Sequence, residues 1–458
     1  MSMGLRKSRK SGRLDRLFRR AIVWSIWMAL IYTLYFETTR DASLATIGSY
    51  NLSFIEVAMV PAFIALIIGV VHRARPGSSL GVLILSLAAI LAFNVFRGML
   101  ESPVAAFKSL RNTGEVFVLM LLVLYFPVDK GLFQKITNAI MMAATYVCIL
   151  EVFRYIYGAS LFLSSVVLSS YKIDQRGASN DGAVLVAAAA VLQMSCLIRR
   201  PSVGFKAAWR YVHLTVLIGG LLVSLQATAI IAGMLALFVV YVFERGKAKS
   251  AHLVRISLAI FLVVPPLVVL AIAPDIVPLP DWVSGYLMNR YTTATFREHL
   301  WAALISDYGQ WSVPDQFFGL PAGILPQLVV PDWGGEIWQF SVHSMYFGLV
   351  INCGVIGLLL YFAILVHSTF QNARFSLRGV NTGLLPSPVA ALALTVLMVV
   401  YGYSYEIRNG TGIFLFLALA AARYSAKAQT VKGLVPNSIP EPFRQSGAFL
   451  PLREEQGR

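Results

Sequence analysis

Two residues in the C-terminal half of the chain have side chains suited to handling phosphate and protons. Arg297 stands in the segment TATFREHLW, four residues before Trp301, and His343 follows in VHSMYFG. A guanidinium can hold two phosphate oxygens at once, so Arg297 could bind a phosphate group. An imidazole titrates near neutral pH, so His343 could accept a proton from a hydroxyl nucleophile. We therefore take Arg297 and His343 as the candidate catalytic residues, with Trp301 beside them.

Other residues could help to bind the same anion. Arg176 lies in DQRGASNDG, Arg290 comes shortly before Arg297, and Arg408 lies in YEIRNG. Two guanidinium groups would clamp a diphosphate between them. Gly319 and Gly323, in FFGLPAG, permit tight turns and the close approach of backbone to a ligand.

Each of these residues also has a purely structural interpretation. Arg297 could form an ion pair with Glu298 or Asp307 at a membrane surface. His343 could cap or pack the start of a helix, and His299 is expected to face solvent. The sequence alone leaves these alternatives open.

We expect neither a metal nor a bound cofactor. The carboxylates near the candidate residues include no Asp-x-Asp pair, and Cys148, Cys196 and Cys353 lie in apolar runs without zinc-ligand spacing. The chain has no nucleotide-binding P-loop and no glycine-rich dinucleotide fingerprint.

The elements that position these residues are expected to lie in a membrane. The chain has 458 residues, of which 57% are hydrophobic and 13% are charged. Its mean hydropathy is +0.71. Soluble proteins have roughly half apolar residues, and apolar runs of about 17–25 residues can cross a bilayer. The composition predicts an all-α polytopic membrane protein.

The apolar runs predict about twelve transmembrane helices, the first of them uncleaved. Residues 1–20 would form a basic N-terminus, 21–424 the transmembrane domain, and 425–458 a disordered tail. Residues 274–342 would form one large loop that carries Arg297 and ends at His343. The predicted spans are 21–36, 52–71, 79–96, 113–128, 132–156, 181–198, 211–225, 227–243, 253–273, 343–366, 388–404 and 411–424.

The net charge of +16 is interpreted through this layout. With both termini cytoplasmic, most Lys and Arg residues fall on the inner side, as the positive-inside rule requires. The loop 274–342 then faces the periplasm of a bacterium with two membranes. No nucleic-acid-binding motif accompanies the charge, so we expect no nucleic-acid partner.

The order of these features resembles the O-antigen ligase and polysaccharide polymerase family of bacterial inner membranes. The matching features are about twelve spans, the large outer loop opening with FREHLW, the glycine motif FFGLPAG, and the closing HSMYFGLVINCGVIGLLLYF. The RGASND stretch before the sixth span is similar to the family's Arg-Gly segment. The resemblance covers about residues 170–425.

The resemblance implies a glycosyltransferase whose donor is an undecaprenyl-diphosphate-linked glycan. The glycan would be moved to a sugar hydroxyl at the periplasmic face without metal and with inversion. Arg297 would hold the diphosphate with help from Arg176, and His343 would deprotonate or orient the acceptor. The acceptor would be a growing glycan or a lipid core, and export or chain-length proteins would be partners.

The chain departs from the family's pattern at two positions. The family often has Arg in the turn where this chain has Gln226, and Asn where it has Ser344. Arg176 or Arg290 would then replace the missing Arg.

A transporter or lipid flippase is the competing interpretation. Such proteins tend to have internal repeats, broken helices and ionisable residues at mid-membrane. Here the predicted spans are largely apolar and the candidate charges gather at one surface. The sequence does not decide between polymerase and ligase, and it does not identify the sugar.

Overall fold

The structure is a computed structural model in which most of the chain is described and almost all of the described part is helical. The described residues are 2–39, 43–47, 50–72, 78–125, 130–157, 179–199, 204–224, 226–245, 281–329, 337–338, 342–377, 386–405 and 409–434.

The helices match the predicted apolar runs closely. Each predicted span has a helix at its place except 253–273, which lies outside the described residues. The helices are α1 (Ser2–Thr39), α2 (Phe54–His72), α3 (Ser79–Glu101), α4 (Pro103–Tyr125), α5 (Lys130–Tyr157), α7 (Asn180–Arg199), α8 (Phe205–Val223), α9 (Ala227–Arg245), α11 (Asp281–Tyr308), α12 (Val313–Phe318), α13 (Met345–Leu377), α14 (Pro388–Ser404) and α15 (Asn409–Leu434).

Two short antiparallel strand pairs complete the described secondary structure. β1 (Ser43–Ile47) pairs with β2 (Tyr50–Ser53), and β3 (Leu328–Val329) pairs with β4 (Ile337–Trp338). The second pair belongs to the segment between α12 and α13.

Six helices in the described part of the chain are long and apolar enough to cross a membrane. The chain is therefore a helical, multi-pass membrane protein, whereas the full count of twelve remains a prediction. The six are Leu14–Tyr35, Ser79–Glu101, Lys130–Arg154, Asn180–Arg199, Ala227–Glu244 and Met345–Ser376. Shorter apolar helices lie at Met59–Val71, Val116–Tyr125, Ala207–Val223, Pro388–Ser404 and Gly412–Tyr424.

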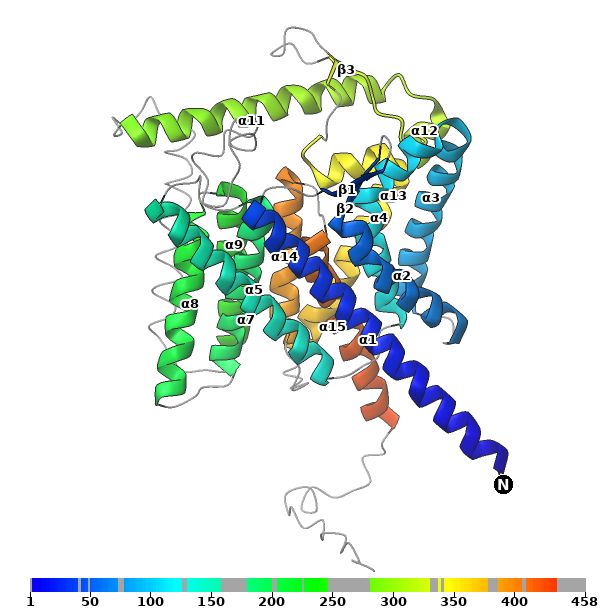
Figure 1. Cartoon of the computed structure of the whole chain (residues 1–458), viewed down its shortest axis with the longest axis vertical. Coiled ribbons are helices and arrows are strands. Elements are labelled where there is room, and N and C mark those ends of the chain that lie inside the picture. The colour runs from blue at the N-terminus through cyan, green and yellow to red at the C-terminus, as the bar shows by residue number, and fades with distance from the viewer. Residues whose placement is uncertain are drawn as a thin grey trace, which may run out of the picture.

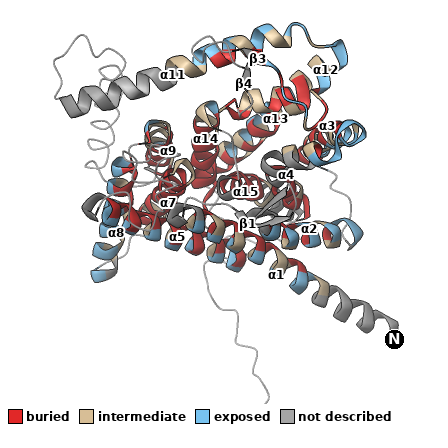
Figure 2. Cartoon of the chain, turned by 45° about the horizontal axis from the view of Figure 1, so that its top comes forward, coloured by how far each residue is buried: buried red, intermediate tan, exposed pale blue. Residues whose placement is uncertain are grey.

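The centre of the bundle is built around α7. Figure 2 shows the buried residues gathered in α7, α14 and α15. The run Ala187–Ala190 of α7 is fully buried, and Gly233 of α9 lies so close that a Cβ there would be 3.0 Å from the Cβ of Ala187. Small side chains let membrane helices approach closely, which gains van der Waals contact in place of a hydrophobic driving force.

Helix α11 lies at the opposite end of this bundle from the start of α1 and the end of α15 (Figure 1). Helix α11 runs across one end of the bundle. Helix α1 begins, and α15 finishes, at the other. Helix α15 continues to Leu434, past the predicted boundary at residue 424.

Helix α13 is broken at Gly354, and a backbone segment occupies the break. Gly354 has φ 65°, and a Cβ on it would lie 2.2 Å from the carbonyl oxygen of Phe317. The carbonyl of Ile351 accepts a hydrogen bond from the N–H of Leu320 at 2.8 Å. A broken helix is tolerated in a membrane protein where neighbouring groups satisfy the freed carbonyls.

This packing predicts a strong effect of Gly354→Ala. The added Cβ would meet backbone, and an alanine at positive φ costs about 1–2 kcal/mol even without a clash. We expect a clear fall in the unfolding temperature of the purified protein in detergent. Gly219→Ala is the matched control, because a Cβ there meets nothing within 4 Å. Equal unfolding temperatures for the two variants would contradict the described packing.

Candidate functional site

Trp301 attaches α11 to the bundle. Its indole N–H donates a hydrogen bond to the carbonyl of Val342 at 2.9 Å, and its side chain is buried. The ring lies 5.3 Å from the ring of Phe347 on α13 and 5.1 Å from that of Tyr403 at the end of α14. The side chain of Trp301 thus links α11 to α13 and α14, and it binds the residue that precedes His343.

A small hydrophobic core of its own supports this contact. Leu300 and Leu304 of α11 are almost fully buried against residues of the segment between α12 and α13 and of α13 itself. Full burial of a leucine stabilises by roughly 1.5–3 kcal/mol, so these side chains fix the position of α11. The cluster consists of Leu300, Trp301, Leu304, Leu328, Val342 and Ile351.

Arg297 lies one helical turn before Trp301, on the same face of α11. Its guanidinium carbon is 4.8 Å from the ring centroid of Tyr405, a cation–π contact. Its Nε is buried and makes no hydrogen bond to any described residue. The aromatic contact holds the side chain while it leaves donor capacity for an anion.

The alternative ion pairs of Arg297 do not form in the described part of the chain. Glu298 is exposed, and Asp307 accepts a hydrogen bond from the indole N–H of Trp311 at 2.7 Å. His299 is also exposed, as expected for a residue that faces solvent.

His343 lies immediately before α13 in an uncommon backbone conformation. Its φ is 53°, and it is the one non-glycine residue of the described part with a positive φ. On one side of His343, the carbonyl of Val342 accepts the hydrogen bond from Trp301. On the other side, the hydroxyl of Ser344 donates to the carbonyl of Gly402 at 3.5 Å. Strained conformations persist where the surroundings enforce them and are enriched at active sites. The half-buried imidazole is therefore held at a defined place.

A ladder of tyrosines leads from Arg297 to the start of α7. Tyr405 stacks on Tyr401 with ring centroids 5.2 Å apart. The hydroxyl of Tyr401 donates to a carboxylate oxygen of Asp181 at 3.3 Å. Beside it, the buried Oδ1 of Asn180 has no hydrogen-bond partner among the described residues. The first turn of α7 thus adds a polar acceptor and a helix N-terminus to this region.

Some of the predicted site residues are described by the structure, and others are not. Arg297 and Trp301 share a face of α11, and Trp301 contacts the residue before His343. Arg176 and Arg408 lie outside the described residues, and for Arg290 only the backbone of α11 is described.

Gly319 and Gly323 lie against protein backbone. Their φ angles are 94° and 91°, as a glycine-specific turn requires. A Cβ on Gly319 would be 2.6 Å from the backbone nitrogen of Cys353, and one on Gly323 would be 2.5 Å from the carbonyl carbon of Ala105. Close packing onto α13 and α4 explains both glycines, and their contact with a ligand remains a prediction.

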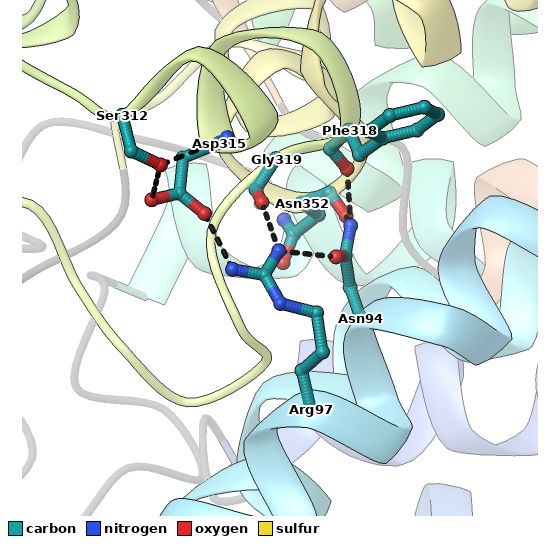
Figure 3. Close-up of polar contacts among 7 residues, drawn as sticks. All are labelled: Asn94, Arg97, Ser312, Asp315, Phe318, Gly319 and Asn352. Atoms are coloured by element: carbon teal, nitrogen blue, oxygen red, sulfur yellow. Dashed lines mark hydrogen bonds and ion pairs between the residues drawn. The ribbon is translucent and has the colours of Figure 1, made fainter.

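A polar clamp between α3 and α12, missed by the sequence analysis, holds the same segment (Figure 3). Arg97 forms an ion pair with Asp315 at 2.5 Å and donates to the carbonyl of Gly319 at 3.0 Å. Asn94 donates to the carbonyls of Phe318 and, at 2.9 Å, Asn352. Charge-assisted bonds of this kind are about twice as strong as neutral ones.

Only a weak indication of this polar clamp is present in the sequence. Asn94 and Arg97 stand one turn apart in an apolar helix, which marks polar groups that need partners. Nothing in the sequence identifies Asp315 or the loop carbonyls as those partners.

The described residues contain no group of three His, Cys, Asp or Glu side chains placed to hold a metal ion. Arg297 offers a guanidinium beside the ring of Tyr405, and His343 offers an imidazole next to the residue that Trp301 binds. Such groups suit an anionic ligand and a hydroxyl-bearing partner.

No protein-family model matches this chain, and a search of characterised proteins found no match.

The Trp301 contact can be tested by Trp301→Phe, which keeps an aromatic ring and removes the N–H donor. The buried carbonyl of Val342 would lose its partner, which costs about 1–3 kcal/mol. We expect a lower unfolding temperature in detergent. Trp311→Phe is the control, because it removes a similar bond to Asp307 within one partly exposed turn. An equal or larger loss for Trp311→Phe would argue against the Trp301 contact as the anchor.

Proposed function

We propose that this chain is a membrane glycosyltransferase that moves an undecaprenyl-diphosphate-linked glycan onto a sugar hydroxyl at the periplasmic face. One observation carries the proposal. Arg297 lies half-buried over Tyr405 with no carboxylate partner among the described residues, on the helix whose Trp301 binds the residue before His343.

The reaction follows from the two side chains. The acceptor hydroxyl oxygen attacks the anomeric carbon, and the bond from that carbon to the diphosphate oxygen breaks. The electron pair leaves with the diphosphate, whose growing negative charge Arg297 stabilises. The imidazole of His343 accepts the hydroxyl proton. Attack opposite the leaving group inverts the anomeric configuration.

The proposed topology places this reaction outside the cytoplasm. It consists of about twelve spans, with both termini cytoplasmic and residues 274–342 in the periplasm of a bacterial inner membrane. The arrangement of α11 opposite the start of α1 and the end of α15 supports it (Figure 1). The donor's lipid tail would lie between helices, and the acceptor would be a growing glycan or a lipid core. Export or chain-length proteins would act on the product.

The proposal predicts that His343→Ala and Arg297→Ala block transfer. Removal of a general base costs typically 10²–10⁴-fold in rate, and we expect at least a hundredfold loss for either variant. The measurement is the amount of lipid-linked oligosaccharide and polymeric glycan in cells, at equal membrane levels of protein. His299→Ala, on the exposed side of α11, is the control and should transfer normally. Normal glycan from both site variants would rule out this mechanism.

A second prediction concerns the ring beneath Arg297. Tyr405→Phe keeps the π face, whereas Tyr405→Leu removes it and frees the guanidinium to move. We expect near-normal transfer for Tyr405→Phe and a loss of about tenfold for Tyr405→Leu, from a cation–π contribution of about 1 kcal/mol or more. If phenylalanine is as damaging as leucine, the hydroxyl and not the ring is what matters at this position.

A flippase for lipid-linked glycans is the second candidate, because α13 is broken at Gly354 and broken helices are common in transporters. The backbone of α12 and the following loop occupies that break, which favours a structural role for it. Reconstituted vesicles that move labelled lipid-linked oligosaccharide across the bilayer would support the flippase. Glycan transfer confined to one face would support the transferase.

A further inference from the structure

A basic pocket lies between α1 and α5. The start of α5 lies at the end of the bundle away from α11 (Figure 1). Its volume is about 270 Å³, and its polar lining comes from Arg19 and Arg20 of α1 and Lys135 of α5. The described residues that line it include no carboxylate, although Asp15 lies one turn before Arg19 on α1. Arg20 and Lys135 are exposed and Arg19 is half-buried, so the pocket presents positive charge around its mouth.

The remaining walls are apolar and well fixed. Val23, Trp24 and Leu132 line the pocket. The helix faces behind it are anchored, since Phe18 and Phe133 are completely buried. Phe133 also packs edge-on against Tyr424 of α15, with ring centroids 6.4 Å apart. The helix backbones that form the pocket are therefore held in place before a ligand binds.

Its surroundings face lipid. Trp24 is 61% exposed although it belongs to an apolar membrane-spanning helix, and Trp27 and Ile31 continue the exposed apolar strip along α1. Tryptophan is enriched where hydrocarbon meets headgroups, so the pocket lies at headgroup depth. Its volume is just below the roughly 300–1,000 Å³ of pockets for drug-sized ligands, which suits a headgroup and excludes a glycan chain.

We propose that this pocket binds the phosphate headgroup of an anionic phospholipid of the leaflet opposite α11, with Arg19, Arg20 and Lys135 around the phosphate and the acyl chains along Trp24. Guanidinium groups grip phosphate oxygens in pairs, and an ammonium adds a point charge. Basic pockets between membrane helices are suited to such headgroups. The site is separate from the region of Arg297 and His343 and does not depend on the proposed transfer reaction.

The test titrates the full-length protein in detergent with phosphatidylglycerol or phosphatidylcholine and measures bound lipid by native mass spectrometry. We expect the first phosphatidylglycerol to bind about tenfold more tightly than phosphatidylcholine. The triple variant Arg19→Gln/Arg20→Gln/Lys135→Gln should lose this preference. The control Arg16→Gln/Lys130→Gln/Arg374→Gln removes the same charge at exposed residues outside the pocket lining and should keep it.

Three results would overturn the site. They are equal phosphatidylglycerol binding by the wild type and the pocket variant, an equal loss in the control variant, and displacement of the lipid by inorganic phosphate, which would indicate a free-phosphate site. If the triple variant fails to fold, Arg20→Gln/Lys135→Gln takes its place, because both side chains are exposed at the pocket rim. Its preference for phosphatidylglycerol over phosphatidylcholine should fall severalfold, and unchanged binding would again contradict the proposal.

Discussion

The hydrogen bond from the Trp301 indole to the Val342 carbonyl is the contact on which the proposed site depends. It ties a helix that lies across one end of the bundle to the residues just before α13, and the rings of Phe347 and Tyr403 pack against the indole. Because the bond is buried, its loss would leave an unsatisfied carbonyl. Arg297 lies one helical turn before Trp301, and His343 follows Val342 in the chain. The position of Arg297 relative to His343 therefore depends on this hydrogen bond.

The segment from α12 to the start of α13 is held a second time by close backbone packing. Gly319 and Gly354 let two stretches of chain meet where a Cβ would clash, and the carbonyl of Gly319 accepts a bond from Arg97. Arg97 also pairs with Asp315, so a charged clamp fixes α12 to α3. A rigid segment between α11 and α13 matters for the proposed chemistry, because transfer between two bound substrates gains much of its rate from fixed geometry.

The positions of the helices and the candidate residues were predictable from the sequence, whereas the contacts between residues far apart in the chain required the fold. The lengths of the apolar runs located the helices, because a helix of about 20 apolar residues is long enough to cross a bilayer. Residue chemistry singled out Arg297, Trp301 and His343, but the cation–π contact with Tyr405 joins residues far apart in the chain and leaves no local pattern. Gly319 and Gly323 were recognised as turn positions, whereas the backbone of α13 and α4 against which they pack could not be identified from the sequence.

The most direct test of the central claim is the affinity of the purified protein for undecaprenyl diphosphate, the released product. If Arg297 holds the diphosphate and His343 only accepts a proton, Arg297→Gln should weaken binding by at least tenfold, as expected for a lost charge-assisted contact, while His343→Gln binds as the wild type does. Equal affinity for the wild type and Arg297→Gln would contradict the account.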